Sequence, residues 1–128
     1  MKTVILTCEN WYNSYLISNK IGLPIFDVRK EINWSFDCYL FVFANKGDEE
    51  LPSEMETFLI DLKIKNKNYQ ICELGNYFGY ENPFGAADIA YCLLNKLDWK
   101  MISPILSLDT VPGIDWVALN TWIENEIR

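Results

Sequence analysis

Three apolar runs, each followed by a polar turn and then by a helical pattern, constrain the fold of this chain most strongly. The runs are Thr3–Thr7, Tyr39–Ala44 and Tyr69–Leu74, and the first two are apolar at consecutive rather than alternate positions. Such runs, rich in β-branched and aromatic residues, are typical of strands that are buried on both faces. Strands that alternate with helices predict an α/β fold, a parallel sheet with helices on both of its faces.

Weaker patterns predict the remaining elements. Short strands are expected at Ile25–Val28 and over Met101–Leu106, where Ser103–Pro104 interrupts the run and favours a sheet edge. The predicted helices are Tyr15–Ile21, ending at Gly22, then a helix from Pro52 to Leu62, Ala86–Leu97 and Ile114–Ile127. Residues 8–14, 29–37 and 107–113 are predicted loops. The last helix is expected to bury Val117, Ala118, Trp122 and Ile123.

The order of the elements also predicts the topology. Right-handed crossovers, with the first strand near the middle, give a doubly wound five-stranded sheet of order 2-1-3-4-5. The chain of 128 residues is expected to form a single domain, 1–128. Ligands of such sheets bind beyond the carboxyl ends of the strands, where the strand order reverses. Three loops are expected at that edge, at residues 8–14, 45–52 and 75–85.

The third of these loops has the composition of a site for a flat ligand. Residues 75–85 hold three glycines, two tyrosines, two phenylalanines and two asparagines in eleven positions. Glycine and asparagine allow positive φ and a close approach of the backbone, and the aromatic rings offer flat faces. The alternative is an aromatic-rich loop that only covers the edge of the sheet.

Charge and composition exclude several classes of function. A net charge of −7 argues against nucleic acid and favours protein partners with a basic face. No apolar run reaches the length of about 18 residues that suggests a membrane span. The first residues are predicted as a strand and not as a signal peptide, so we expect a cytoplasmic protein. We also expect a monomer.

The cysteine spacing and the lack of histidine argue against a metal site and against a catalytic nucleophile activated by histidine. Cys8, Cys38, Cys72 and Cys92 are widely spaced, no C-x-x-C occurs, and the chain has no histidine. Zinc or iron–sulfur ligation and a Cys–His or Ser–His pair are therefore unsupported. We expect the cysteines to be small core residues and the protein to have no catalytic activity of its own.

Two loops resemble those of the flavodoxin family. Gly47–Pro52 resembles the family's G-D-G-E-L-P loop, and Leu74–Asp88 resembles the aromatic flavin-ring loop that ends in G-A-A-D. The resemblance covers about residues 39–127. It implies a flavodoxin-like fold that binds FMN non-covalently and carries electrons between redox partner proteins.

The loop after the first strand departs from the family pattern. Flavodoxins hold the FMN phosphate with a T-x-T-G-x-T loop at a helix N-terminus. Aligned on its last residue, the corresponding positions are Glu9, Asn10, Trp11, Tyr12, Asn13 and Ser14. A carboxylate beside a phosphate would repel it by about one to several kcal/mol. Glu9 thus points away, or the phosphate is held differently, or FMN does not bind.

The resemblance also implies the residues around the flavin ring. Tyr80 is the residue expected to stack on the ring, and Trp11 could cover the ring or the ribityl chain. Gly75, Asn76 and Gly79 would offer backbone N–H groups to the polar edge of the ring. The other residues expected at the cofactor are Tyr77, Phe78, Phe84, Asn45, Lys46, Gly47 and Asp48.

Two further features leave the role of the protein open. Acidic residues around position 50 form either a rim that steers basic redox partners or an ordinary solvated helix start. The chain lacks the second helix of typical flavodoxins, and Gly22–Pro24 and Gly75–Gly79 are similar to the flavodoxin-like activators of class Ib ribonucleotide reductase. The alternatives are therefore that activator subtype and a flavodoxin-fold interaction module that has lost FMN binding.

Overall fold

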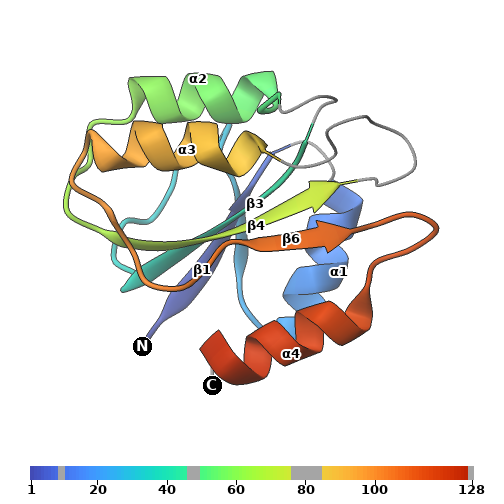
Figure 1. Ribbon diagram of the computed structural model, residues 1–128. Helices are drawn as coiled ribbons and strands as arrows, with labels where there is room; N and C mark the ends of the chain where they lie inside the picture. The colour runs from blue at the N-terminus through green and yellow to red at the C-terminus, as the bar shows by residue number, and fades with distance from the viewer. Residues whose placement is uncertain (9–10, 46–49, 76–84, 127–128) are drawn as a thin grey trace.

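The computed structural model describes residues 1–8, 11–45, 50–75 and 85–126 (Figure 1). Strands and helices alternate along most of the chain. In order, they are β1 (Thr3–Thr7), α1 (Trp11–Ile21), β2 (Ile25–Asp27), β3 (Cys38–Ala44), α2 (Ser53–Asp61), β4 (Asn68–Gly75), α3 (Ala86–Asn95), β5 (Lys100–Met101), β6 (Leu106–Asp109) and α4 (Trp116–Glu126).

All pairings in the sheet are parallel, and the strand order is β2-β1-β3-β4-β5, with β6 also paired to β4. The predicted doubly wound order 2-1-3-4-5 is therefore confirmed. The predicted fifth strand is present in two pieces, because Ser103–Pro104 divides it into β5 and β6. Proline has no N–H to donate, so the ladder with β4 stops there and resumes at Leu106.

The predicted strand ended at Leu106, so residues 107–109 of β6 were predicted as loop. Ser107 and Asp109 suggest a turn by their polarity, yet Leu106–Asp109 pairs with Cys72–Gly75 of β4. The longer strand β4 has backbone groups that pair with these residues, and Leu108 is fully buried. Tertiary pairing therefore overrides the weak local preference.

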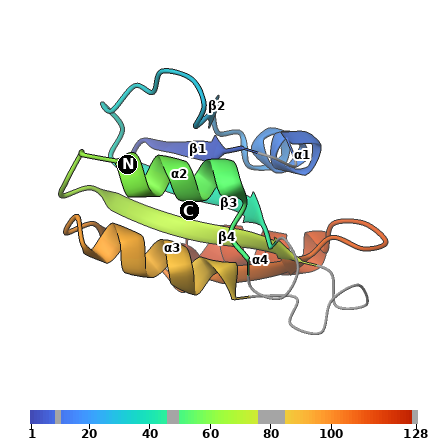
Figure 2. The same cartoon turned by 90° about the horizontal axis from the view of Figure 1, so that it is seen from above.

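Two helical layers cover the sheet (Figures 1 and 2). Helices α2 and α3 lie side by side on one face, and α1 and α4 lie on the other. The first face carries Tyr39, Phe41 and Ile71, which pack with Met55 of α2 and Ala90 of α3, among others. The second carries Ile5, Leu40 and Val42, and these pack with Ile17 of α1 and Trp122 of α4, among others. Alternate residues of the strands thus supply both cores, as expected for a doubly covered parallel sheet.

The connection from β2 to β3 covers its part of the sheet with aromatic side chains and without a helix. Residues 29–37 are irregular, as predicted. The ring of Trp34 stacks on Phe58 of α2 with centroids 6.2 Å apart, and meets Trp99 edge-on at 6.1 Å. Phe36 contacts Tyr39 of β3 in the same edge-on manner. Large aromatic rings bury much apolar surface each, so this crossover can cover the sheet without a helix.

Helix ends differ from prediction by small amounts. Helix α1 begins at Trp11, so the predicted loop was wrong for residues 11–14. Gly22 ends α1 with φ of +79°, and its N–H donates to the Ser18 carbonyl at 2.8 Å, which confirms the predicted C-terminal glycine. Pro52 is the N-cap of α2 and not its first residue.

The buried face of α4 was predicted correctly for Trp122 and Ile123, while Ala118 is partly buried against the same core and Val117 is not part of it. Val117 was expected in the core but is 78% exposed, whereas Leu119 is fully buried. Leu119, Trp122 and Ile123 follow the i, i+3, i+4 spacing of one helix face. Val117 precedes Leu119 by two residues, or about 200° around the helix, and therefore faces solvent.

We predict that Leu119→Ala lowers the free energy of unfolding by about 2–5 kcal/mol, because it leaves a cavity between α4 and the sheet. The matched control on the same helix is Val117→Ala, which should change it by less than about 0.5 kcal/mol. Both values are measured by urea denaturation. Equal losses in the two variants would contradict the observed register of α4.

Candidate functional site

The carboxyl ends of the parallel strands meet at one edge of the molecule. Thr7 ends β1, Ala44 ends β3, Gly75 ends β4 and Asp109 ends β6. The registers place Thr7 beside Val42, Ala44 beside Leu74 and Gly75 beside Asp109, so these ends lie within a few residues of one another along the strands. Strand order reverses here, since β1 is followed by β2 on one side and β3 lies on the other. This is the position at which doubly wound sheets bind their ligands.

The described chain includes only some of the residues predicted at the cofactor. Trp11, Tyr12, Asn13 and Ser14 lie in the first turns of α1, and Asn45 and Gly75 lie at the ends of β3 and β4. The roles of the others stay predictions, because the following residues lie outside the described ranges: Glu9, Asn10, Lys46, Gly47, Asp48, Asn76, Tyr77, Phe78, Gly79, Tyr80 and Phe84.

A buried pair of hydroxyls joins the end of β1 to the start of α1. Thr7 Oγ1 and Ser14 Oγ lie 2.7 Å apart, and both residues are fully buried. The Ser14 hydroxyl was predicted at the phosphate, but here it is directed to Thr7. Of its neighbours in α1, Asn13 is half-buried and Tyr12 is 72% exposed.

The N-terminus of α1 offers a different set of donors at the same edge. The first N–H groups of an α-helix have no acceptor within the helix, and the helix dipole adds positive potential there. The first turn of α1 has no acidic residue. The N–H groups of Trp11–Ser14 are therefore donors of the kind that bind phosphate groups at helix N-termini.

The ends of β3 and β4 are tied together beside α1. The Asn45 N–H donates to the Leu74 carbonyl at 2.8 Å. The Gly75 carbonyl accepts two hydrogen bonds of 3.1 Å from Thr110, one from its N–H and one from its Oγ1. Asn45 and Gly75, both predicted at the flavin ring, are thus held side by side.

Glu73 is a residue of this edge that the sequence analysis did not single out. It is 3% exposed and lies on β4, two residues before the strand ends. Its Oε2 accepts hydrogen bonds from the N–H groups of Gly85 and Ala87 at 3.1 and 3.0 Å, and its Oε1 accepts one from Ser107 Oγ at 3.0 Å. A glutamate inside a strand buried on both faces was the signal for such a role, because a buried carboxylate needs partners.

Burial disfavours the thiolate form of two cysteines. Burial raises the pKa of the Cys38 thiol to about 11 and that of the Cys72 thiol to about 12, so both are protonated near neutral pH. Cys8 is also buried, which confirms the predicted core role for these three. The prediction was wrong for Cys92, which is exposed, because the buried stripe of α3 runs through Ala86, Ala90 and Leu94.

Two kinds of feature are absent from the described residues. No group of three or more acidic, cysteine or histidine side chains in that part of the chain could hold a metal ion. None of the helices described there is long and apolar enough to cross a membrane.

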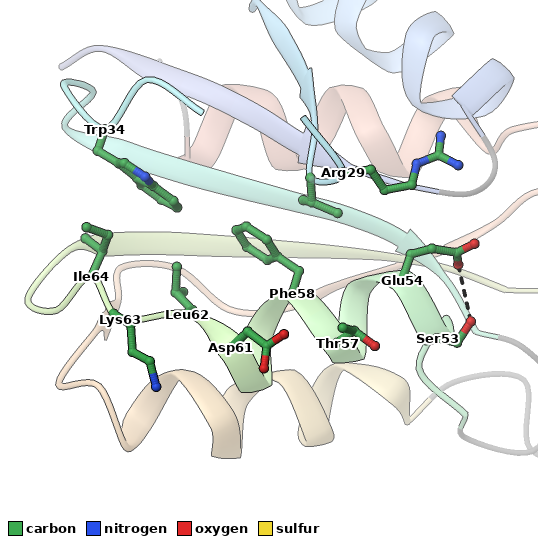
Figure 3. A pocket seen from close by; sticks show the side chains of 11 residues that line it. Arg29, Trp34, Ser53, Glu54, Thr57, Phe58, Asp61, Leu62, Lys63 and Ile64 are labelled. Carbon is green, nitrogen blue, oxygen red and sulfur yellow. Dashed lines mark hydrogen bonds between the residues drawn. The ribbon is translucent and has the colours of Figure 1, made fainter. Parts of the chain in front are cut away.

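A groove of about 600 Å³ runs along α2, next to the helix-free connection 29–37 (Figure 3). Phe58 and Leu62 point from α2 toward the sheet, and Trp34 reaches over them from residues 29–37. Arg29 lies at the other end and pairs with Asp27 at 2.6 Å, which lowers the pKa of that carboxyl. The residues predicted at the cofactor are not among those that line this groove.

Solved structures with this arrangement are flavodoxins. Flavodoxin 2 from Bacillus cereus aligns over 99% of this chain and 96% of its own, with a TM-score of 0.77 and 18% identity. A Streptococcus pneumoniae TIGR4 flavodoxin aligns over 99% and 97%, with a TM-score of 0.73 and 19% identity. A Fusobacterium nucleatum flavodoxin bound to FMN aligns over 80% and 70%, with a TM-score of 0.64 and 19% identity.

These likenesses show that the chain has the flavodoxin-like, doubly wound α/β fold, as the resemblance implied. No protein-family model matches the chain, and no curated protein matches it in sequence. At 18–19% sequence identity, the similarity to these solved structures shows the fold of this chain and nothing further.

We predict that Thr7 and Ser14 are energetically coupled. Either Ser14→Ala or Thr7→Val alone removes one of the two hydroxyls and leaves the other buried without its hydrogen bond. Each single substitution should lower the free energy of unfolding by about 1–3 kcal/mol. The double variant Thr7→Val/Ser14→Ala should cost at least about 0.5 kcal/mol less than the sum of the two.

Denaturant unfolding of the four proteins measures this cycle. The control is Thr121→Ala, because the Thr121 hydroxyl bonds the Val117 carbonyl on the exposed face of α4. Its removal should change stability by less than about 0.5 kcal/mol. Additive losses from the Thr7 and Ser14 substitutions would refute the coupling.

Proposed function

We propose that the protein binds FMN non-covalently and carries electrons between redox partner proteins. The main support for this proposal comes from the edge of the sheet at which the strand order reverses. There the N-terminus of α1 and the two ends of the linker 76–84 lie on a flavodoxin-like sheet. The linker has the glycine and aromatic composition of a site for a flat ring.

In this proposal the two ends of FMN are held by different means. The first N–H groups of α1 and Asn13 would hold the phosphate, and the linker 76–84, with Tyr80 stacked on the ring, would hold the flavin. When bound, FMN supplies the ability to accept electrons and return them one or two at a time. The chain supplies binding, exclusion of water and charge, and no pair of general acid and base, so it is an electron carrier and not an enzyme by itself.

We predict that the purified protein quenches the fluorescence of added FMN with a defined stoichiometry. Tyr80→Ala should weaken FMN binding by about tenfold, because a lost aromatic stack is worth roughly 1 kcal/mol or more. The matched control is Tyr91→Ala, since Tyr91 is exposed on α3 and is not part of the linker. It should leave FMN affinity unchanged.

A second candidate function has its own observation. The Ser14 hydroxyl is buried against Thr7, and Tyr12 stands where flavodoxins have a glycine in the phosphate loop. Both features favour a flavodoxin-fold interaction module without flavin. A protein that neither copurifies with FMN nor quenches its fluorescence would establish this alternative and reject the electron carrier.

The redox partners in this proposal have a basic docking face. Glu50 and Glu56 are exposed and Glu54 is partly exposed around the start of α2, which lies at the carboxyl edge (Figure 1). Negative charge beside the cofactor would attract a basic partner and speed its approach.

We predict that the FMN-loaded, reduced protein transfers electrons to a basic c-type cytochrome at a rate that falls as salt rises. The double variant Glu50→Gln/Glu56→Gln should slow this transfer about two- to tenfold at low salt, and less at high salt. Glu124→Gln is the control, because Glu124 is exposed on α4, on the opposite face of the sheet. Equal effects of the two sets of substitutions would refute a docking face at α2.

A further inference from the structure

The connection from β2 to β3 runs past β1 without a helix, whereas α1, α2 and α3 follow β1, β3 and β4. Crossovers between parallel strands are right-handed, and this one runs back across the sheet, against the direction of the crossover through α1. A helix in it would therefore lie on the face opposite α1, next to α2. The irregular segment 29–37 takes that place, and it borders the groove along α2 (Figure 3).

The floor of this groove is apolar. Trp34 and Phe58 are partly buried, and their ring planes lie 15° apart. Ile64 lines the same end of the groove as Trp34, and the buried side chains of Val28 and Leu62 complete the lining. Aromatic rings that keep part of their surface exposed beside an apolar floor offer pockets for the anchor residues of a partner.

The wall on the α2 side is acidic. Glu54 and Asp61 both line the groove, and they lie seven residues apart, which is about 10.5 Å along a helix axis. Among the described residues, no cation lies within ion-pair distance of either carboxylate, because the ion pair found there is Arg29–Asp27. Glu54 Oε2 accepts a hydrogen bond from Ser53 Oγ at 3.4 Å. Two turns of α2 thus present two carboxylates without a cation partner.

The cations that line the groove lie at its two ends (Figure 3). Arg29 donates from Nε and Nη2 to both carboxylate oxygens of Asp27, so its charge is already balanced. Lys63 lies at the other end, beyond the last residue of α2. A complementary partner therefore places positive charge opposite Glu54 and Asp61, and negative charge opposite Lys63.

A second copy of this chain does not have the complementary surface. Among the described helices α1–α4, Lys20 at the end of α1 is the one basic residue. The net charge of −7 also makes two copies repel each other. The occupant that fits the groove is therefore a different protein.

We propose that the groove along α2 binds an amphipathic helix of a partner protein. Apolar side chains of that helix pack on Trp34 and Phe58, and two basic residues seven positions apart pair with Glu54 and Asp61. Helices that dock in grooves use anchors at i, i+3, i+4 and i+7, and the same spacing brings charged residues to one side. This docking does not depend on FMN, because the residues predicted at the cofactor do not line the groove.

A synthetic peptide tests the groove in the intact protein. The probe is an alanine-rich helix of about 15 residues, with leucines at i, i+3, i+4 and i+7, two lysines seven positions apart, and a glutamate at the end that meets Lys63. In NMR titrations, the indole N–H of Trp34 and the amides of residues 54–64 should shift and saturate. The indole N–H of Trp122, which donates to the Pro104 carbonyl under the opposite helical layer, should not shift.

Charge exchange in the peptide and in the protein tests the pairing. A peptide with its lysines and glutamate exchanged should bind at least about tenfold more weakly. Glu54→Gln/Asp61→Asn should weaken binding of the original peptide about three- to tenfold. The matched control is Glu50→Gln/Glu56→Gln, which removes the same charge from residues that line a separate depression beside Ile89 of α3. It should change the affinity by less than about twofold at physiological salt.

Thr57→Arg blocks the groove without touching the core. Thr57 is exposed and lines the groove, so a long basic side chain there obstructs the site and repels the lysines of the peptide. Binding should be lost, while the midpoint of urea unfolding stays unchanged. Wild-type affinity in this variant would show that the peptide binds elsewhere and would overturn the inference.

The remaining outcomes are equally decisive. Absence of binding to the wild-type protein, shifts confined to α3 or α4, or equal affinity for the charge-exchanged peptide would each reject the partner helix. A dimer in sedimentation experiments, with concentration-dependent shifts at Trp34, would replace it by a second copy of the chain. The titrations use protein without FMN, so failure of the electron-carrier proposal leaves their result intact, and failure of peptide binding leaves that proposal intact.

Discussion

Burial of β1, β3 and β4 on both faces is the constraint on which the structure depends. Every residue of β1 and β3 is buried, so their backbone groups must pair with neighbouring strands and both faces must be covered by other elements. Helices α1, α2 and α3 provide this cover after β1, β3 and β4. After β2, the side chains of Ile32, Trp34 and Phe36 provide it from an irregular segment. The groove along α2 is a consequence, because side chains fill that space less completely than a helix.

The same burial explains how the candidate site is held. At the carboxyl edge the chain leaves the sheet, and buried polar side chains fix the points of departure. The Thr7–Ser14 pair joins β1 to α1, and Glu73 joins β4 and β6 to α3. Such groups are costly unless satisfied, and once satisfied they are hard to displace, so they define geometry more strictly than exposed contacts do.

Prediction from the sequence succeeded where a pattern depends on neighbours in the chain. Continuous apolar runs identified β1 and β3, and Gly22 identified the end of α1, because both signals arise from local physics. It failed where another element decides. Leu106–Asp109 is a strand because β4 extends beside it, and Cys92 is exposed because α3 turns Ala90 and Leu94 toward the sheet. The site was predicted as a set of loops at the carboxyl edge, and Asn45 and Gly75 lie at that edge, whereas residues 11–14 are helical and Glu73 was overlooked.

The sequence by itself determined the alternation of strands and helices, hence the strand order, and the glycine- and aromatic-rich composition of the linker after β4. These follow from hydrophobic periodicity and from the conformational freedom of glycine, which act over a few residues. Only the tertiary structure decided that Ser14 turns its hydroxyl to Thr7, and that Glu73 caps a helix twelve residues further along. Those contacts depend on the register of β4 against β6 and on the packing of helices against the sheet, which no local pattern encodes.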